Sequence, residues 1–239
     1  MIFINARFLT QEIGGVQRFA EQLCLALKEI RNDLVFVAPH GIKRHESAKA
    51  LEVRCIGRNS GHLWEQLDLP LYLRRQGNPL LLSTCSTGPM LYSNHIATHH
   101  DITYVRFPHS YTRMFRTVYR IITPIMLSRI KTLVTSSSFS KGEISRFYGF
   151  AEKKVLVLPA AVSDAFVPAT PTENVGKYLL AVSSPSAHKN FHRMIQAFMS
   201  LRGHEDVQAL TGYLPIRICN AWPVGTLESA FWDGSAMPN

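Results

Sequence analysis

A lysine and an asparagine stand where a short turn opens into a helical pattern. The stretch SPSAHKNFHRMIQAF, residues 184–198, follows an apolar run and places Lys189 and Asn190 directly before the apolar positions of a helix. A helix N-terminus offers free backbone N–H groups and a partial positive charge, and an ammonium group beside it adds a full one. This combination could stabilise an anion such as a diphosphate, including charge that develops on a leaving group. An exposed lysine before an ordinary helix is the alternative.

Two more pairs of residues stand at predicted strand ends or helix starts. Gly14 and Gly15 lie between the first apolar run and the first helical pattern, where missing side chains would let backbone N–H groups approach a diphosphate. A tight turn would explain the same glycine pair. His100 and Asp101 end an apolar run, and the carboxyl ends of strands face the ligand crevice in an open α/β sheet. We therefore place both residues among the catalytic candidates.

The spacing of histidines, cysteines and acidic residues does not favour a metal site. His95 and His99 lie near His100, but alternation along a strand points His99 and His100 to opposite faces. The four cysteines are widely spaced without a C-x-x-C pair, so neither zinc nor a disulfide framework is expected. The chain also lacks Asp-x-Asp, a Walker loop and G-x-G-x-x-G, which disfavours metal-dependent transferases, ATPases and common dinucleotide oxidoreductases. We expect no metal and no tightly bound cofactor.

The elements that must position these residues alternate between strand and helix. Predicted strands cover residues 1–5, 34–39, 51–56, 80–85, 95–100, 132–137 and 154–159. GVQRFAEQLCLALKEI has apolar residues at helical spacing, and a capping box at Ser140–Glu143 predicts a helix from there to about Tyr148, before Gly149. This alternation predicts an α/β fold, a Rossmann-like domain with a mostly parallel sheet.

The periodicity predicts one whole domain and the beginning of another. Residues 1–158 form the first domain, and 159–176, rich in Pro, Ala and Thr, read as a linker. Residues 177–202 hold one strand and one helix of a second Rossmann-like domain, which cannot enclose a core alone. Residues 203–239 show no sustained period and read as an atypical tail. We therefore expect a chain truncated within its second domain.

Basic residues gather in one part of the chain. The net charge is +9, and between residues 101 and 154 there are ten Lys or Arg against three Asp or Glu. The helical pattern of residues 111–131 mixes Arg113, Arg116 and Arg120 with apolar side chains, so these arginines are candidates for facing an anionic lipid surface. An ordinary amphipathic helix, bent at Pro124, is the alternative. No nucleic-acid-binding motif is present.

Neither a signal peptide nor a membrane-spanning segment is expected from the sequence. The N-terminus lacks a basic segment followed by a long apolar block, and no apolar run approaches the length needed to cross a bilayer. We expect a cytoplasmic protein, with peripheral contact at the inner face of the membrane as an open possibility.

Seven stretches, in this order, resemble a known family. They are RFLTQEIGGVQRFAEQL, WEQLDLPLYLRR, STGP, THHDITYVRFP, TSSSFSKGEISRFYG, VLVLPAAV and YLLAVSSPSAHKNFHRMIQAF. Together they look like retaining family 4 glycosyltransferases of the GT-B fold, in particular the bacterial mannosyltransferases that build surface polysaccharide. The resemblance implies an acceptor-side domain followed by a donor-binding domain. It gives His100 a place in the sugar and acceptor pocket, and Lys189 with its turn a place on the donor diphosphate.

The resemblance also implies a reaction and its substrates. The implied activity is transfer of a hexose, with mannose from GDP-mannose favoured, to a lipid-linked oligosaccharide such as an O-antigen or lipopolysaccharide precursor. The family's second domain carries two glutamates separated by seven residues; Glu21 and Glu29 have that spacing but lie in the wrong domain. We therefore expect this chain to be weakly active or inactive.

Two other functions remain open from the sequence. One is a non-catalytic remnant that binds acceptor or membrane. The other is a different sugar-nucleotide enzyme such as an epimerase, which should carry a Tyr-x-x-x-Lys pair; no tyrosine of this chain has a lysine four residues on.

Overall fold

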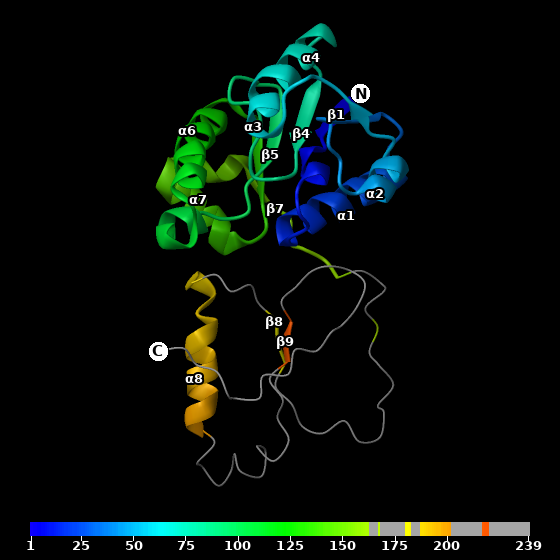
Figure 1. Cartoon of the computed structure of the whole chain (residues 1–239). Helices are drawn as coiled ribbons and strands as arrows, with labels where there is room; N and C mark the ends of the chain where they lie inside the picture. The colour runs from blue at the N-terminus through cyan, green and yellow to red at the C-terminus, as the bar shows by residue number, and fades with distance from the viewer. Residues whose placement is uncertain (163–166, 168–179, 183–186, 202–216, 220–239) are drawn as a thin grey trace. The chain divides into compact units, whose positions relative to one another are not determined.

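The computed structural model divides the chain into two compact units, Met1–Ala161 and Val162–Asn239. It describes residues 1–162, 167, 180–182, 187–201 and 217–219. Figure 1 shows the helices and strands of both units. Among the helices that are described, none is both long and apolar enough to cross a membrane.

The first unit is built on a seven-stranded sheet in which every neighbouring pair is parallel. The strands are β1 (Ile2–Asn5), β2 (Leu34–Ala38), β3 (Arg54–Cys55), β4 (Leu80–Ser83), β5 (His95–Thr98), β6 (Thr132–Thr135) and β7 (Val155–Val157). Their order in the sheet is β3-β2-β1-β4-β5-β6-β7. The order reverses between β1 and β4, and ligands bind at such a switch point, outside the carboxyl ends of the strands. The predicted α/β fold with a mostly parallel sheet is confirmed.

Helices cover both faces of this sheet because its strands are apolar on both sides. On one face, α1 (Gly15–Ile30) and α2 (His45–Ala50) pack over Ile4 and Phe36. On the other, a continuous helical stretch packs over Phe3 and Leu81. That stretch consists of α3 (Gly61–Leu63), a π-helical segment (Trp64–Asp68) and α4 (Leu69–Arg75).

The same second face continues under two further helices. α6 (Arg113–Arg129) and α7 (Ser138–Tyr148) share a buried cluster with Ala97 and Leu133, which are in register with Ser83 of β4. A short helix, α5 (Thr103–Arg106), follows β5. Figure 1 shows α1 and α2 grouped on one side of the unit and α6 and α7 on the other.

Two sequence-based predictions need correction. Helix α7 begins at Ser138, because the hydroxyl of Ser137 accepts a hydrogen bond from the backbone N–H of Ser140 at 3.1 Å and caps the helix there. The predicted capping box is therefore wrong, and Glu143 pairs with arginines instead. Strand β3 is only Arg54–Cys55, since the residues before it end helix α2 and its turn. The predicted end at Gly149 is confirmed, with a left-handed φ of 65°.

The second unit contains β8 (Leu180–Val182), a 3-10 turn (Ala187–Lys189), α8 (Phe191–Leu201) and β9 (Arg217–Cys219). Strands β8 and β9 pair in parallel. Strand β9 lies in the segment for which the sequence predicts no regular element. The predicted linker and tail otherwise lie almost wholly outside the described residues.

Candidate functional site

His100 is held at the carboxyl edge of the sheet by three neighbouring elements. Its ring packs edge-to-face on Phe19 of α1, with centroids 5.0 Å apart. Its carbonyl oxygen accepts hydrogen bonds from the hydroxyls of Thr135 and Ser136, at 3.2 and 3.4 Å. The imidazole also makes a hydrogen bond to the backbone of Thr84, in the loop after β4. The ring orientation is therefore fixed by α1 and the loop after β4, and the backbone of His100 is fixed by the end of β6.

The environment of His100 favours a neutral imidazole. Burial lowers the pKa of His100, and the Thr84 backbone and the Asp101 carboxylate oppose that shift only in part. The Nε2 atom is buried and has no hydrogen-bond partner among the described residues. A neutral ring that binds Thr84 through its other nitrogen presents a lone pair at Nε2. This atom could accept a hydrogen bond from a hydroxyl group of a ligand.

Asp101 follows His100 and lies two residues before helix α5. Its Oδ1 accepts a hydrogen bond from the backbone N–H of Thr103 at 2.8 Å, which fixes the carboxylate in a local turn. Asp101 also lines a pocket of about 360 Å³ together with Phe107 and Phe139, two residues that are 52% and 79% exposed. The carboxylate group of Asp101 thus lines a partly apolar pocket.

The N-terminus of α1 reaches the same edge of the sheet. The Sγ atom of Cys85, next to Thr84, lies 3.9 Å from the carbonyl oxygen of Val16. Neither Gly14 nor Gly15 has a left-handed φ, so a tight turn does not require glycine there. A Cβ at Gly15 would meet nothing within 4 Å. The first turn has no acidic residue and no side-chain cap. This geometry leaves room for an anion to approach the backbone N–H groups.

A buried polar network lies behind this edge and was not predicted from the sequence. The Glu65 carboxylate accepts hydrogen bonds from Asn5 at 2.7 Å, from Arg7 Nε at 3.2 Å and from Thr87 at 2.7 Å. It also contacts His62 Nδ1 at 3.3 Å. Arg7 Nη2 donates to Thr87 at 2.9 Å, so this hydroxyl lies between the two charged groups. The Arg7 and Glu65 side chains are only 6% and 1% exposed, so this is a buried ion pair.

The Glu65 carboxylate is ionised in this network. Burial alone would raise its pKa, but Arg7 and hydrogen bonds from His62 and Thr87 outweigh burial and lower the pKa to about 2. Both Arg7 and Glu65 stand in stretches that resemble the family, yet nothing in the residue types indicates that they pair.

The network connects to the histidines through residues 84–88. Thr87 belongs to this loop, the carbonyl of Ser86 contacts His99 Nδ1 at 3.1 Å, and Thr84 binds His100. His95 contacts Ser83 instead, so the three histidines have different partners. Within the described part of the chain, no group of three or more His, Cys, Asp or Glu could hold a metal ion.

Lys189 and Asn190 belong to the second unit, and their surroundings are described within that unit. Lys189 is exposed and ends the 3-10 turn, and Asn190 has a left-handed φ of 51°. The backbone N–H of Asn190 donates to the carbonyl of Ala187 at 3.1 Å, and α8 begins at the next residue. The predicted arrangement of a lysine just before a helix is therefore present.

The arginines predicted to face a membrane do not share one environment. Arg113 and Arg120 are exposed on α6, whereas Arg116 is half-buried.

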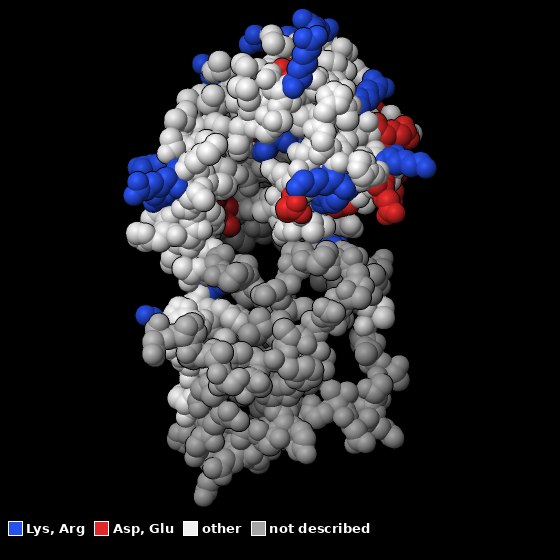
Figure 2. Space-filling model, viewed as in Figure 1, with Lys and Arg blue, Asp and Glu red and all other residues white. Residues whose placement is uncertain are grey.

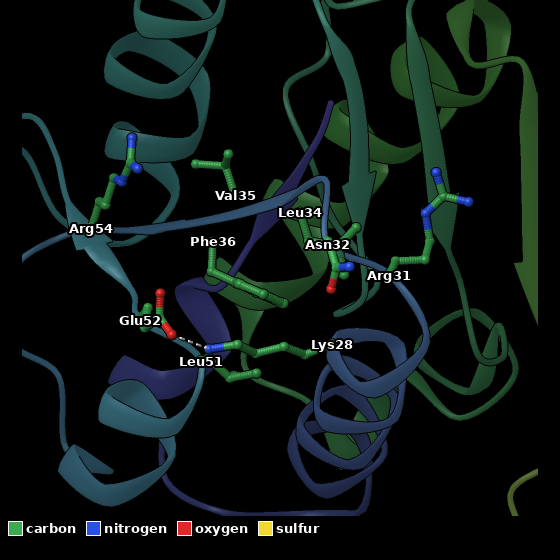
Figure 3. A pocket seen from close by; sticks show the side chains of 9 residues that line it. All are labelled: Lys28, Arg31, Asn32, Leu34, Val35, Phe36, Leu51, Glu52 and Arg54. Carbon is green, nitrogen blue, oxygen red and sulfur yellow. Dashed lines mark hydrogen bonds and ion pairs between the residues drawn. The ribbon is translucent and has the colours of Figure 1, made fainter.

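A second pocket, of about 190 Å³, lies at the amino ends of β2 and β3 (Figure 3). Lys28 on α1 pairs there with Glu52 at 2.7 Å. Because the strands are parallel, this pocket at their amino ends lies on the opposite edge of the sheet from His100.

The chain is similar to a known protein family and to one solved structure. No curated protein matches the chain. The crystal structure of MurG from Acinetobacter baumannii is similar at 11% identity and a TM-score of 0.44; the alignment covers 92% of this chain and 66% of that one. This chain thus spans slightly less than two thirds of the length of that protein. Residues 13–166 match the family described as Glycosyltransferase Family 4. Because this match covers more than half of the 239 residues, the chain belongs to glycosyltransferase family 4.

Proposed function

We propose that this protein is a nucleotide-sugar-dependent glycosyltransferase whose acceptor-side domain is the first unit. The transferred sugar is a hexose, with mannose from GDP-mannose favoured, and transfer proceeds with retention. The acceptor is a lipid-linked glycan of surface polysaccharide biosynthesis, at the inner face of the cytoplasmic membrane. The observation that carries this proposal is the unpartnered Nε2 of His100 at the carboxyl edge of the sheet, beside Thr84 after β4 and Phe19 of α1, in a chain of family 4.

Each candidate residue has a role that follows from its chemistry. His100 accepts a hydrogen bond from a sugar hydroxyl, and Asp101 is the next residue at the same strand end, where it lines a neighbouring pocket. The N-terminus of α1 binds diphosphate oxygens through the backbone N–H groups of Gly14 and Gly15; the space beside Gly15 is open, and Gln17 Oε1 lies beside Gly14. In the second unit, the Lys189 ammonium and the turn at Asn190 stabilise the negative charge that develops as the glycosidic bond breaks. The reaction requires no tightly bound metal or cofactor.

Donor binding tests the first step of this proposal. Ligand at about 100 times its dissociation constant should stabilise the fold by about 2.7 kcal/mol, a rise in melting temperature of roughly 5–10 °C. We expect this shift with GDP-mannose and a smaller one with GDP-glucose or UDP-glucose. Lys189→Ala should abolish it, whereas Lys153→Ala, at an exposed lysine of the first unit, should not. A shift unchanged by Lys189→Ala would contradict the role of that lysine.

Transfer itself needs a second assay. Incubation with GDP-mannose and lipid-linked oligosaccharide, followed by NMR of the product, reports turnover and anomeric configuration. Turnover by this chain should be low, and His100→Gln should lower it more than it lowers donor affinity, because the Nε2 atom is assigned to a sugar hydroxyl. An inverted product would contradict retention.

A non-catalytic role in binding acceptor or membrane is the second candidate. The exposed apolar helix faces of the first unit favour it. Membrane binding without any donor-induced shift would support this role over catalysis.

A further inference from the structure

The pocket that Asp101 lines is formed by helices α5 and α7 and the residues beside them. Asp101 and Thr103 follow strand β5, and Phe139 and Ser140 follow strand β6, so the pocket lies at the same carboxyl edge of the sheet as His100. Its volume of about 360 Å³ is at the small end of the range for ligand pockets, about 300–1,000 Å³. The pocket therefore has the size of a site for one small group of a larger ligand.

Aromatic side chains make part of the pocket apolar. Phe107 follows helix α5, Phe139 lies in the first turn of α7, and the buried side chain of Ile102 lines the pocket with them. Because Phe139 is 79% exposed, its ring contributes little to the packing of α7 and is accessible to a ligand. The face of an aromatic ring carries partial negative charge, which attracts C–H groups of a ligand.

Charged groups of both signs line the same pocket. Asp101 uses Oδ1 for the backbone N–H of Thr103, and its Oδ2 has no hydrogen-bond partner in the described part of the chain. The Arg106 guanidinium group binds Glu143 Oε2 through Nε at 2.8 Å and through Nη2 at 2.6 Å, and its Nη1 group is not used in that pair. The pocket thus offers hydrogen-bond acceptors and a donor beside its aromatic rings.

The two carboxylates of the pocket contrast with the charge of the surrounding sequence. Residues 101–154 contain ten Lys or Arg and three acidic residues, and two of those three, Asp101 and Glu143, line the pocket. In Figure 2, the acidic side chains that are visible gather mainly on the side that carries α1 and α2. Two carboxylates beside one guanidinium group disfavour a phosphate or another anion as the ligand.

A sugar ring is a ligand that matches both the apolar and the charged groups. One face of a pyranose ring consists of C–H groups that pack on an aromatic ring, while its hydroxyl groups donate to carboxylates and accept from a guanidinium group. A hydrocarbon chain would instead cover the charged groups without making hydrogen bonds, which is costly. The combination of groups therefore selects a neutral, hydroxyl-rich ligand.

We propose that this pocket binds an acceptor sugar adjacent to the sugar that binds at His100. Asp101, the residue after His100, lines the pocket, so the two sites are neighbours at the carboxyl edge of the sheet. The acceptor is then a glycan of at least two sugar residues, because a monosaccharide cannot occupy both sites. This inference rests on the proposed transferase function, which makes the bound glycan an acceptor.

Saturation-transfer NMR of the full chain, without donor, tests the pocket. The probes are the disaccharides mannobiose, maltose and lactose, each compared with the methyl glycosides of mannose, glucose and galactose. At least one disaccharide should bind, and more tightly than the methyl glycosides do. Because that disaccharide spans both sites, Phe139→Leu and His100→Gln should each weaken its binding, roughly two- to ten-fold.

Helix α7 supplies matched controls outside the pocket. Phe147 is 51% exposed, and Arg146 donates to Glu143 at 2.9 Å as Arg106 does, yet neither is among the described residues that line the pocket. Phe147→Leu and Arg146→Gln should leave disaccharide binding unchanged, whereas Arg106→Gln should weaken it as Phe139→Leu does. Melting curves verify that every variant folds.

The outcomes distinguish this inference from the proposed function. The inference is overturned if none of the disaccharides binds, or if Phe139→Leu binds them as tightly as the wild type. Donor binding is measured separately, by the thermal shift with GDP-mannose. A donor shift without disaccharide binding refutes this inference alone. Disaccharide binding that depends on Phe139, without a donor shift, contradicts the proposed transferase and leaves the pocket as a glycan-binding site.

Discussion

Replacing Glu65 by glutamine should destabilise the protein, because the buried guanidinium group of Arg7 then has no counter-charge. The substitution keeps the shape of the side chain but leaves the Arg7 guanidinium, 6% exposed, without a carboxylate. Breaking one partner of a buried ion pair costs about 3–5 kcal/mol. For a chain of this size that corresponds to a fall in melting temperature of about 6–20 °C. Thermal and denaturant unfolding at pH 7 measure it directly.

The pH dependence of the unfolding free energy is an independent test of the same ion pair. The folded pKa of Glu65 is about 2, below its ordinary value of 4.5, so the folded state binds this proton more weakly than the unfolded state. The pair therefore contributes stability that is fully present above pH 4.5 and is lost as pH falls towards 2. A shift of this size corresponds to about 3 kcal/mol. The Glu65→Gln variant should lack this acid-dependent loss.

The structure also predicts an effect beyond stability. Thr87 lies between Arg7 and Glu65, and its loop binds His99 and His100. We expect the His100 resonance, assigned in NMR by comparison with His100→Gln, to move in the Glu65→Gln variant. An exposed acid-to-amide control, Glu29→Gln, should change none of these observables. A Glu65→Gln protein with wild-type stability at pH 7 and an unchanged acid slope would refute the reasoning.

Three further predictions use simpler substitutions. Burial lowers the pKa of both His95 and His99 to about 4, so stability should fall as pH drops from 6.5 to 4, and a glutamine at either position should flatten that slope in unfolding experiments. Ser137→Ala should cost about 1 kcal/mol of unfolding free energy by removing the α7 cap, and Ser140→Ala should cost less, since Ser140 contributes its backbone N–H to that cap. Gly15→Ala should keep or raise the melting temperature, because no atom lies within 4 Å of the added Cβ, yet it should reduce the donor-induced shift. An unchanged donor shift would exclude a ligand at the α1 N-terminus.

The strands were predictable because parallel strands buried on both faces are continuous apolar runs. Runs such as Leu34–Ala38 and Leu80–Ser83 contain no helical period, and the structure trims the predictions by only one or two residues at most ends. Helix α1 was predicted with its bounds for the opposite reason, since one face of it is apolar. The predicted start of helix α7 was wrong because serines occupy positions 136–138 and 140. Several of these could cap a helix, and only the geometry selects one.

The buried polar network and the inward side of the helical stretch of residues 61–75 were beyond sequence reasoning for physical reasons. Arg7 and Glu65 are 58 residues apart, and only the crossing from β3 to β4 brings the end of β1 to the α3 stretch. In the stretch from residue 61 to 75, leucines occur on both the buried and the exposed face, so periodicity alone cannot tell which leucines turn inward. Packing of Trp64 against the sheet makes that choice.

A paired substitution separates the two roles that the buried ion pair could have. Replacing both partners of such a pair by uncharged groups is often neutral or stabilising, whereas removing one is costly. Arg7→Met combined with Glu65→Gln should therefore recover much of the stability that Glu65→Gln loses, and a double-mutant cycle gives the coupling energy. The residue Thr87 would lose the Arg7 donor, so its loop should still be displaced at His100. Recovered stability with a shifted His100 resonance would mean that the pair positions the loop rather than holding the fold. If stability and the His100 signal recover together, the ion pair has no separate positioning role.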